Sequence, residues 1–378
     1  MVHIKQHPFS PTFSRCVAVV LFASMLFVCC GTLHGAEAQS SQRLTLNGKL
    51  IEKKKKPDIS RNISGVATRG NILVVGADEG ADILIFKQNG EFNYNEAAHV
   101  CIPLDGKECG DARKGAEIDI EGIAWGEKFL YVIGSHSIAR KKVKSKKSHE
   151  ENRQRLETIK VEPTRDQLFR IELDKDGTIA QGTKIEQVSL RNLLVNHPVL
   201  SIFNPIPSKE NGIDIEGLAV KEVDGYDQLY IGLRGPVLRG NHALVMVLEF
   251  KDGEFTESNI KQGEKYPIVH YLNLGGRGIR GMTEVESGGF LLLTGPVGDA
   301  LLGDAQSLYQ VVFWDGKEDD LSGVARKSLC NIPAPDGSKA EGIELLDNNK
   351  TATGTYHFMI VYDGAKKGGA TVFTCKSR

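Results

Sequence analysis

Short apolar runs separated by turns recur along most of the chain, and a four-residue phrase opens each group of runs. The phrase has a polar or charged residue, a glycine, an aliphatic residue, and then a small or polar residue. Its five copies lie at 64–67, 121–124, 216–219, 280–283 and 341–344. A phrase that recurs in this way predicts a repeat architecture in which each unit is one supersecondary element.

Each copy is followed by further apolar runs that alternate with polar residues, the period-2 signature of β-strands. Second strands are expected at 72–76, 130–134, 229–232, 290–294 and 358–362. Third strands are expected at 82–86, 167–173, 243–250, 308–314 and 371–375. Fourth strands are expected at 99–103, 186–190, 268–274 and 327–332, so the fifth unit is one strand short.

These units predict an all-β fold, a β-propeller of about five four-stranded blades. A spare strand at 43–47 would supply the missing strand of the fifth blade, and would close the ring from the N-terminal side. Closure of this kind hides strand edges. A sixth blade formed by region 140–212 is the alternative. The same region carries a charged insertion at about 140–165, with lysines and arginines clustered at 140–147.

The N-terminal segment is predicted to lie outside this fold. Lys5 and Arg15 precede an apolar run at 16–30, which has the length of a signal-peptide core and is short for a membrane span. Ala36 and Ala38 fit a cleavage site. We therefore expect a signal peptide at 1–38 and a single propeller domain at 39–378, exported to the periplasm or the cell exterior. No membrane span is expected in the mature protein.

Cysteine usage fits an oxidising compartment. Cys101, Cys109, Cys330 and Cys375 remain after position 38, an even number that favours two disulfides with three connectivities. Cys101–Cys109 is the local pairing that we expect. The net charge of the whole chain is −1, which argues against a nucleic-acid partner.

The repeat also predicts where polar side chains gather. In a propeller blade the first strand lines the channel and the second runs back beside it, so the start of one meets the end of the other. One mouth should therefore collect candidate acid–base groups and candidate anion-binding groups. The first set is Glu121, Glu216, Glu341 and His136. The second set is Arg234, Arg239, Arg277 and Arg280.

Several carboxylates that face one narrow channel repel each other, so they need a cation, an arginine or protonation. In the first of three interpretations, the arginines neutralise the glutamates and brace the blades. In the second, the oxygen ligands hold a divalent ion, with Ca²⁺ the favoured cofactor. In the third, Glu121, Glu216 and His136 move protons while the arginines hold an anion.

Longer motifs resemble a known family. They lie at 119–124, 134–137, 211–219, 232–240 and 276–281. They resemble a bacterial family catalogued as domain of unknown function 3616, from about residue 59 to the end of the chain. The glutamate–glycine phrase is also similar to one in exported propellers described as phytase-associated and esterase-like. The resemblance implies an exported bacterial propeller and supplies no catalytic residues.

Two functional hypotheses follow. The first is a module that binds a small anionic ligand at the channel mouth, and in its finer form is a metal-dependent ester or phosphoester hydrolase. The alternative is a non-catalytic interaction scaffold with a self-neutralised channel. Propellers carry unrelated activities, so the fold does not choose between them.

Overall fold

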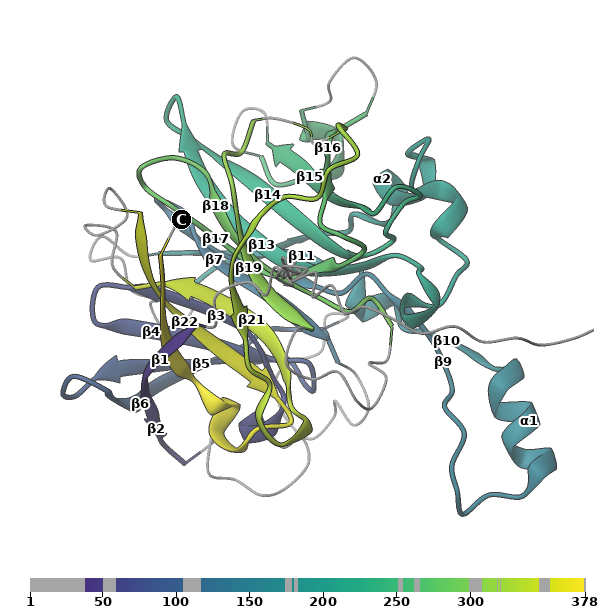
Figure 1. The fold of residues 1–378 in the computed structure, drawn as a ribbon, viewed down its shortest axis with the longest axis horizontal. Coiled ribbons are helices and arrows are strands. Elements are labelled where there is room, and N and C mark those ends of the chain that lie inside the picture. The colour runs from purple at the N-terminus through teal and green to yellow at the C-terminus, as the bar shows by residue number, and fades with distance from the viewer. Residues whose placement is uncertain are drawn as a thin grey trace, which may run out of the picture. The chain divides into compact units, whose positions relative to one another are not determined.

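Five sheets, each with one copy of the repeated phrase in its innermost antiparallel strand, form the main body of the protein (Figure 1). The computed structural model describes residues 38–49, 59–104, 117–173, 179, 183–250, 254–261, 266–298, 308–317, 319, 321–346 and 354–376. These residues belong to one compact unit spanning 35–378. The predicted signal peptide at 1–38 falls, apart from Ala38, outside the described residues.

The blades follow one another in chain order. The first has β3 (Ile63–Arg69), β4 (Ile72–Ala77), β5 (Asp82–Gln88) and β6 (Asn93–Cys101). The second has β7 (Ile120–Trp125), β8 (Phe129–Gly134), β11 (Leu168–Glu172) and β12 (Ile185–Val188). The third has β13 (Asp214–Val223), β14 (Tyr226–Gly235), β15 (His242–Glu249) and β16 (Ile268–Asn273). The fourth has β17 (Gly278–Glu284), β18 (Phe290–Gly295), β19 (Tyr309–Trp314) and β20 (Ser328–Ile332).

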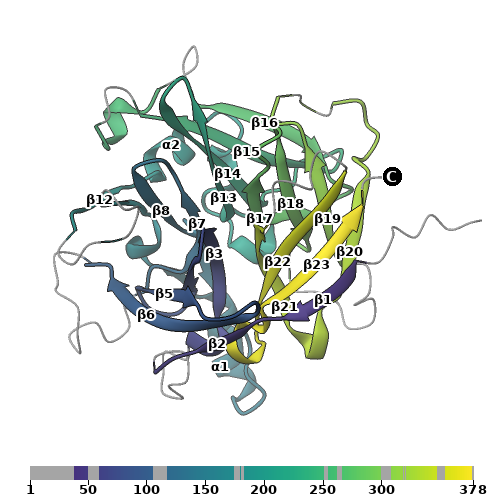
Figure 2. The same cartoon turned by 90° about the vertical axis from the view of Figure 1, so that its left-hand side faces the viewer.

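The fifth blade closes the ring with a strand from the other end of the chain. Its own strands are β21 (Lys339–Leu345), β22 (Thr355–Asp363) and β23 (Thr371–Lys376), and β1 (Gln39–Arg43) pairs with β23. Figure 2 shows β1, in purple, beside the yellow β23. The innermost strands β3, β7, β13, β17 and β21 each contact the next, and β21 contacts β3. The predicted five-bladed propeller with N-terminal closure is therefore confirmed.

The closing strand differs from the prediction in its bounds. The expected strand at 43–47 is divided at Leu44, whose main-chain N–H donates to Ala370 at 2.8 Å. The preceding residues form β1, whereas β2 (Thr45–Asn47) pairs in parallel with β6 and adds a fifth strand to the first blade. Leu44 and Leu46 are both buried, so one alternating segment covers two blades.

Region 140–212 forms no sixth blade in the residues described. It holds the hairpin of β9 (Ile138–Arg140) and β10 (Ile159–Val161), with α1 (His149–Glu157) between them, and then α2 (Arg191–Asn196). Ser148 caps α1 through a capping box, and none of the helix is buried (Figure 1). Leu194 of α2 packs into the core between the second and third blades. No helix within the described ranges has the length and hydrophobicity to cross a bilayer.

One disulfide joins the fourth and fifth blades. Cys330 of β20 and Cys375 of β23 are bonded, with Cα atoms 6.1 Å apart. Cys101 is also disulfide-bonded. Its expected partner Cys109 lies outside the described residues, so that pairing stays a prediction.

Candidate functional site

A β-bulge lies at the first residue of the repeated phrase in every blade. The register of each inner strand against its neighbour shifts at this residue, which is left without a partner in the ladder. The five bulged residues are Ser64, Glu121, Glu216, Arg280 and Glu341. A bulge bends the strand and re-aims a side chain. The polar residue of each blade is therefore turned away from the regular pleat, at the place where the inner strands converge.

The glycine that follows each bulge is needed for the close approach of neighbouring inner strands. A Cβ on Gly122 would lie 2.6 Å from Cβ of Leu218, and one on Gly342 would lie 2.6 Å from the carbonyl oxygen of Ser64. Such separations are shorter than any van der Waals contact, so only glycine fits. These glycines therefore serve the fold.

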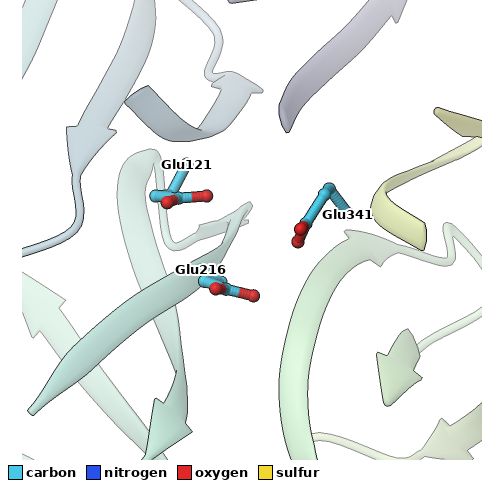
Figure 3. A group of neighbouring side chains, drawn as sticks. All are labelled: Glu121, Glu216 and Glu341. Carbon is cyan, nitrogen blue, oxygen red and sulfur yellow. The ribbon is translucent and has the colours of Figure 1, made fainter. Parts of the chain in front are cut away.

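Three of the bulged residues bring carboxylates together. Glu121, Glu216 and Glu341 each offer an oxygen, and the three oxygens lie within 4.8 Å of one another. Figure 3 shows the carboxylates facing one another from three different strands. Glu216 and Glu341 are 2% and 6% exposed, whereas Glu121 is half-buried. We call these residues the glutamate cluster.

Two buried arginines neutralise part of the cluster. Arg234 of β14 pairs with Asp214 and, at 2.5 Å, with Oε1 of Glu216. Arg280 pairs with Glu341 and, through Nε at 3.3 Å, with Oε2 of Glu216. The arginines are therefore engaged by carboxylates of the protein itself, as the bracing interpretation requires.

The neutralisation is incomplete, because Glu121 forms no ion pair or hydrogen bond with any residue that the structure describes. Oε2 of Glu216 has the ion-pair contact with Arg280 but no hydrogen-bond donor in the described chain. Four carboxylates (Asp214 and the glutamate cluster) face two guanidinium groups, which leaves a formal charge of −2 if all are ionised. This excess of negative charge favours binding of a cation over binding of an anion at the glutamate cluster.

Burial raises the pKa values of these acids, and neighbouring charges modify the shifts. Burial raises the pKa of Glu121 well above its usual range, and Glu216 raises it further. Burial raises the pKa of Glu341 to about 7 against the opposing effect of Arg280. Burial likewise raises the pKa of Asp214 to about 6, although Arg234 opposes the change. A bound metal ion would supply the missing positive charge and would therefore favour the ionised form of each acid.

The structure does not bring His136 into the cluster. Its backbone has φ +52°, and its ring is buried beside the main chain. Nδ1 lies 2.8 Å from the carbonyl oxygen of Gly134, and Nε2 accepts from the N–H of Leu190 at 3.4 Å. Burial lowers the pKa of His136 to about 4. A neutral ring with both nitrogens engaged is not placed to exchange protons with the glutamates.

The remaining predicted arginines are also apart from the cluster. Arg239 is exposed, and Arg277 donates to the carbonyl oxygen of Leu308 at 3.4 Å. Sequence reasoning missed Arg165, which pairs with Glu117 and, at 2.9 Å, with Asp119. Arg165 follows the charged insertion, and nothing in the sequence separates it from the other basic residues there.

Fold and site together define a five-bladed β-propeller with an acidic group of side chains at one end of its inner strands. The chain belongs to the family described as Protein of unknown function (DUF3616), which matches residues 62–371. No curated protein matches the chain in sequence.

Solved structures of low similarity align with most of the chain. Myxococcus xanthus glutaminyl cyclase is 8% identical with a TM-score of 0.41, covering 90% of this chain and 97% of that chain. Penicillium chrysogenum α-L-arabinanase, solved with arabinobiose, is 9% identical with a TM-score of 0.41, covering 89% and 98%. Bacillus subtilis arabinanase Arb43A is 13% identical with a TM-score of 0.37, covering 82% and 92%.

Proposed function

We propose that the glutamate cluster binds a divalent cation, favouring Ca²⁺, and that this cation holds a small anionic ligand at the channel mouth. The observation that carries the proposal is the carboxylate of Glu121, which forms no ion pair or hydrogen bond with a described residue while it faces Glu216 and Glu341. Carboxylate oxygens are the ligands that Ca²⁺ prefers, and its flexible coordination suits an irregular cluster. When all four carboxylates are ionised, the residual formal charge of −2 matches one divalent ion.

The cation, and not the arginines, would bind the anion. Arg234 and Arg280 are already paired with carboxylates, so a ligand would have to break those ion pairs to use them. A cation with open coordination positions binds phosphate or carboxylate oxygens directly. The finer form of the proposal is hydrolysis of an ester or phosphoester, in which the cation would polarise the reacting oxygen.

The test is the melting temperature of the purified protein in EDTA and then with millimolar CaCl₂, supported by calorimetric titration. A ligand at about 100 times its dissociation constant adds about 2.7 kcal/mol, which is a rise of a few degrees in a domain of this size. We expect Glu121→Gln to abolish the rise. Glu344→Gln, in the same strand as Glu341, is the matched control and should keep it.

A ligand screen follows if Ca²⁺ binds. Phosphoesters and carboxylate esters are added to the Ca²⁺-loaded protein, and both binding and product release are measured against Glu121→Gln. Binding without turnover would support the hypothesis of a binding module and contradict the hypothesis of a hydrolase.

The ion pairs of Arg234 and Arg280 favour one alternative, a scaffold whose channel charges only brace the blades. If no divalent ion raises the melting temperature, the metal site is wrong and this alternative stands. Export belongs to the proposal too, because extracellular Ca²⁺ sites work at about 10⁻⁴–10⁻³ M. Mass spectrometry of the N-terminus of the secreted protein would check cleavage after Ala38.

A further inference from the structure

A second cavity lies at the opposite end of the same inner strands. It has a volume of about 450 Å³ and is lined by residues that follow the glycine of the repeated phrase in β3, β7, β13, β17 and β21. Six of these lining residues are Thr68, Arg69, Trp125, Met282, Thr283 and Glu344. A volume of this size lies within the range of about 300–1,000 Å³ that small-molecule sites occupy.

The repeated phrase explains why a cavity forms here. Its third residue is aliphatic, and Ile123, Leu218 and Met282 line the cavity on the side nearer the glutamate cluster. Its fourth residue is alanine in three blades, at Ala67, Ala124 and Ala219. Small side chains at this position leave room between the strands. The fifth blade departs from the pattern by placing Glu344 at the same position.

Glu344 is held by hydrogen bonds from two other blades. Its Oε1 accepts from the main-chain N–H of Thr68 at 2.8 Å and from the hydroxyl of Thr68 at 3.0 Å. Its Oε2 accepts from the hydroxyl of Thr283 at 3.0 Å. Carboxylate oxygens offer about four acceptor positions, so one stays open. The carboxylate is thus fixed in orientation.

No positive charge accompanies these hydrogen bonds. Glu344 forms no ion pair with any residue in the described ranges, and burial raises its pKa to about 7 while the donors of Thr68 and Thr283 oppose the rise. The other charged groups that line the cavity are Glu284, Glu286 and Arg69. Three carboxylates and one guanidinium give a formal charge of −2.

Arg69 is not placed to neutralise Glu344. Its guanidinium stacks on the ring of Trp125, 4.8 Å from the centroid, and donates to the carbonyl oxygen of Gly126. The ring of Trp125 thus forms part of the cavity wall, and its buried Nε1–H has no acceptor among the described residues.

We propose that this cavity binds a small organic cation, a primary ammonium or a guanidinium group on a compact body, with the carboxylate of Glu344 as its counter-ion. Ile123, Leu218 and Met282 contact the body of the ligand, and the ring of Trp125 adds an aromatic wall. The site is separate from the glutamate cluster, so it takes an organic cation whether or not that cluster takes a metal.

The probes are putrescine and agmatine, with butanediol as a neutral molecule of the same chain length as putrescine. The chain has two tryptophans, of which Trp125 lines the cavity and Trp314 is fully buried in the core. Fluorescence of a Trp314→Phe variant therefore reports on Trp125 alone. Calorimetric titration of the unmodified protein gives the same affinity without that substitution.

We expect saturable binding of putrescine or agmatine, at least about tenfold weaker in Glu344→Gln, which corresponds to about 1.4 kcal/mol. Glu121→Gln, at the other end of the strands, is the matched control and should bind the probes like the unmodified protein. Melting curves establish that both variants are folded.

Three results would overturn the proposal. These are equal binding of butanediol and putrescine, unchanged binding of the cations by folded Glu344→Gln, and no binding of either cation at millimolar concentration. If Glu344→Gln does not fold, the comparison of putrescine with butanediol on the unmodified protein still decides whether the site selects positive charge.

Discussion

The two ends of the inner strands hold buried carboxylates in different ways. At one end, Glu216 and Glu341 pair with Arg234 and Arg280. At the other end, Glu344 is held by Thr68 and Thr283, and by no basic residue of the described chain. The glutamates at both ends belong to the same repeated phrase. Glu216 and Glu341 are its first residue, and Glu344 is its fourth. The comparison shows that burial alone does not set the behaviour of an acid, because the partners supplied by other blades decide it.

The largest expected effect comes from removing an arginine at the glutamate cluster. Arg280→Met leaves Glu216 and Glu341 buried without that partner, and breaking a buried ion pair typically costs about 3–5 kcal/mol. Urea unfolding measures the loss. Arg239→Met is the control, since Arg239 is exposed and should change stability by about 0.5 kcal/mol or less. A small loss in Arg280→Met would mean that the glutamates are already neutral.

A medium effect is expected at Asp78, an acid at the same end that forms no ion pair with a described residue. Burial, together with Asp119, raises the pKa of Asp78 from 3.8 to about 8, and its Oδ1 has no hydrogen-bond donor. The folded protein binds this proton more tightly than the unfolded chain, so stability falls as pH rises through that window. Asp78→Asn should therefore stabilise by about 1–3 kcal/mol at neutral pH.

The gain in Asp78→Asn should vanish near pH 4 and grow until about pH 8, as melting curves across this range would show. Glu79→Gln removes a neighbouring charge but leaves Asp78 in place, so its gain should be smaller. A gain that does not depend on pH would contradict the assignment to Asp78.

The smallest effect is expected for Glu344→Gln at the cavity. Because burial raises the pKa of Glu344 to about 7, ionisation lowers stability as pH rises from 4.5 to about 7. The amide removes this cost but donates where a carboxylate accepts, so the net gain above pH 7 should be about 1 kcal/mol or less.

Melting temperature against pH measures this gain, with Thr283→Val as the companion variant. Loss of the Thr283 hydroxyl should lower stability, because it removes one donor to the carboxylate. A strongly destabilising Glu344→Gln would mean that the hydrogen bonds of Glu344 to two other blades stabilise the fold by more than ionisation of its carboxylate costs. The proposed difference between the two ends of the inner strands would then be wrong.

The strands and blades could be predicted because their signals are local. A period-2 alternation and a repeated phrase require only neighbouring residues, and all five inner strands lie where the phrase placed them. The exception is informative. Leu44 and Leu46 alternate regularly, yet β1 ends before Leu44 and β2 begins after it. The same alternation is compatible with pairing to β23 and with pairing to β6. The sequence therefore could not show that the segment splits into two strands.

The site was predictable in its acids and less so in their partners. Glu121, Glu216 and Glu341 were expected together because they share one position of the phrase. His136 was expected at the same mouth, but a backbone with positive φ places its ring beside Gly134 and Leu190. Arg165 was not expected, although it pairs with Asp119. The spacing of residues along the chain predicts neither the orientation of a side chain in a turn nor the pairing of residues from distant segments.

The sequence by itself determined the class of fold and the placing of three glutamates at equivalent positions, because these follow from periodicity, while the tertiary structure excluded a sixth blade among the described residues. Only the tertiary structure decided that a bulge turns those glutamates toward one another and that Arg234 and Arg280 neutralise only part of their charge. It also joined Cys330 to Cys375 and left a cavity around Glu344. These features depend on which strands meet across the ring, and closing that ring sets distances between residues that are far apart in the chain.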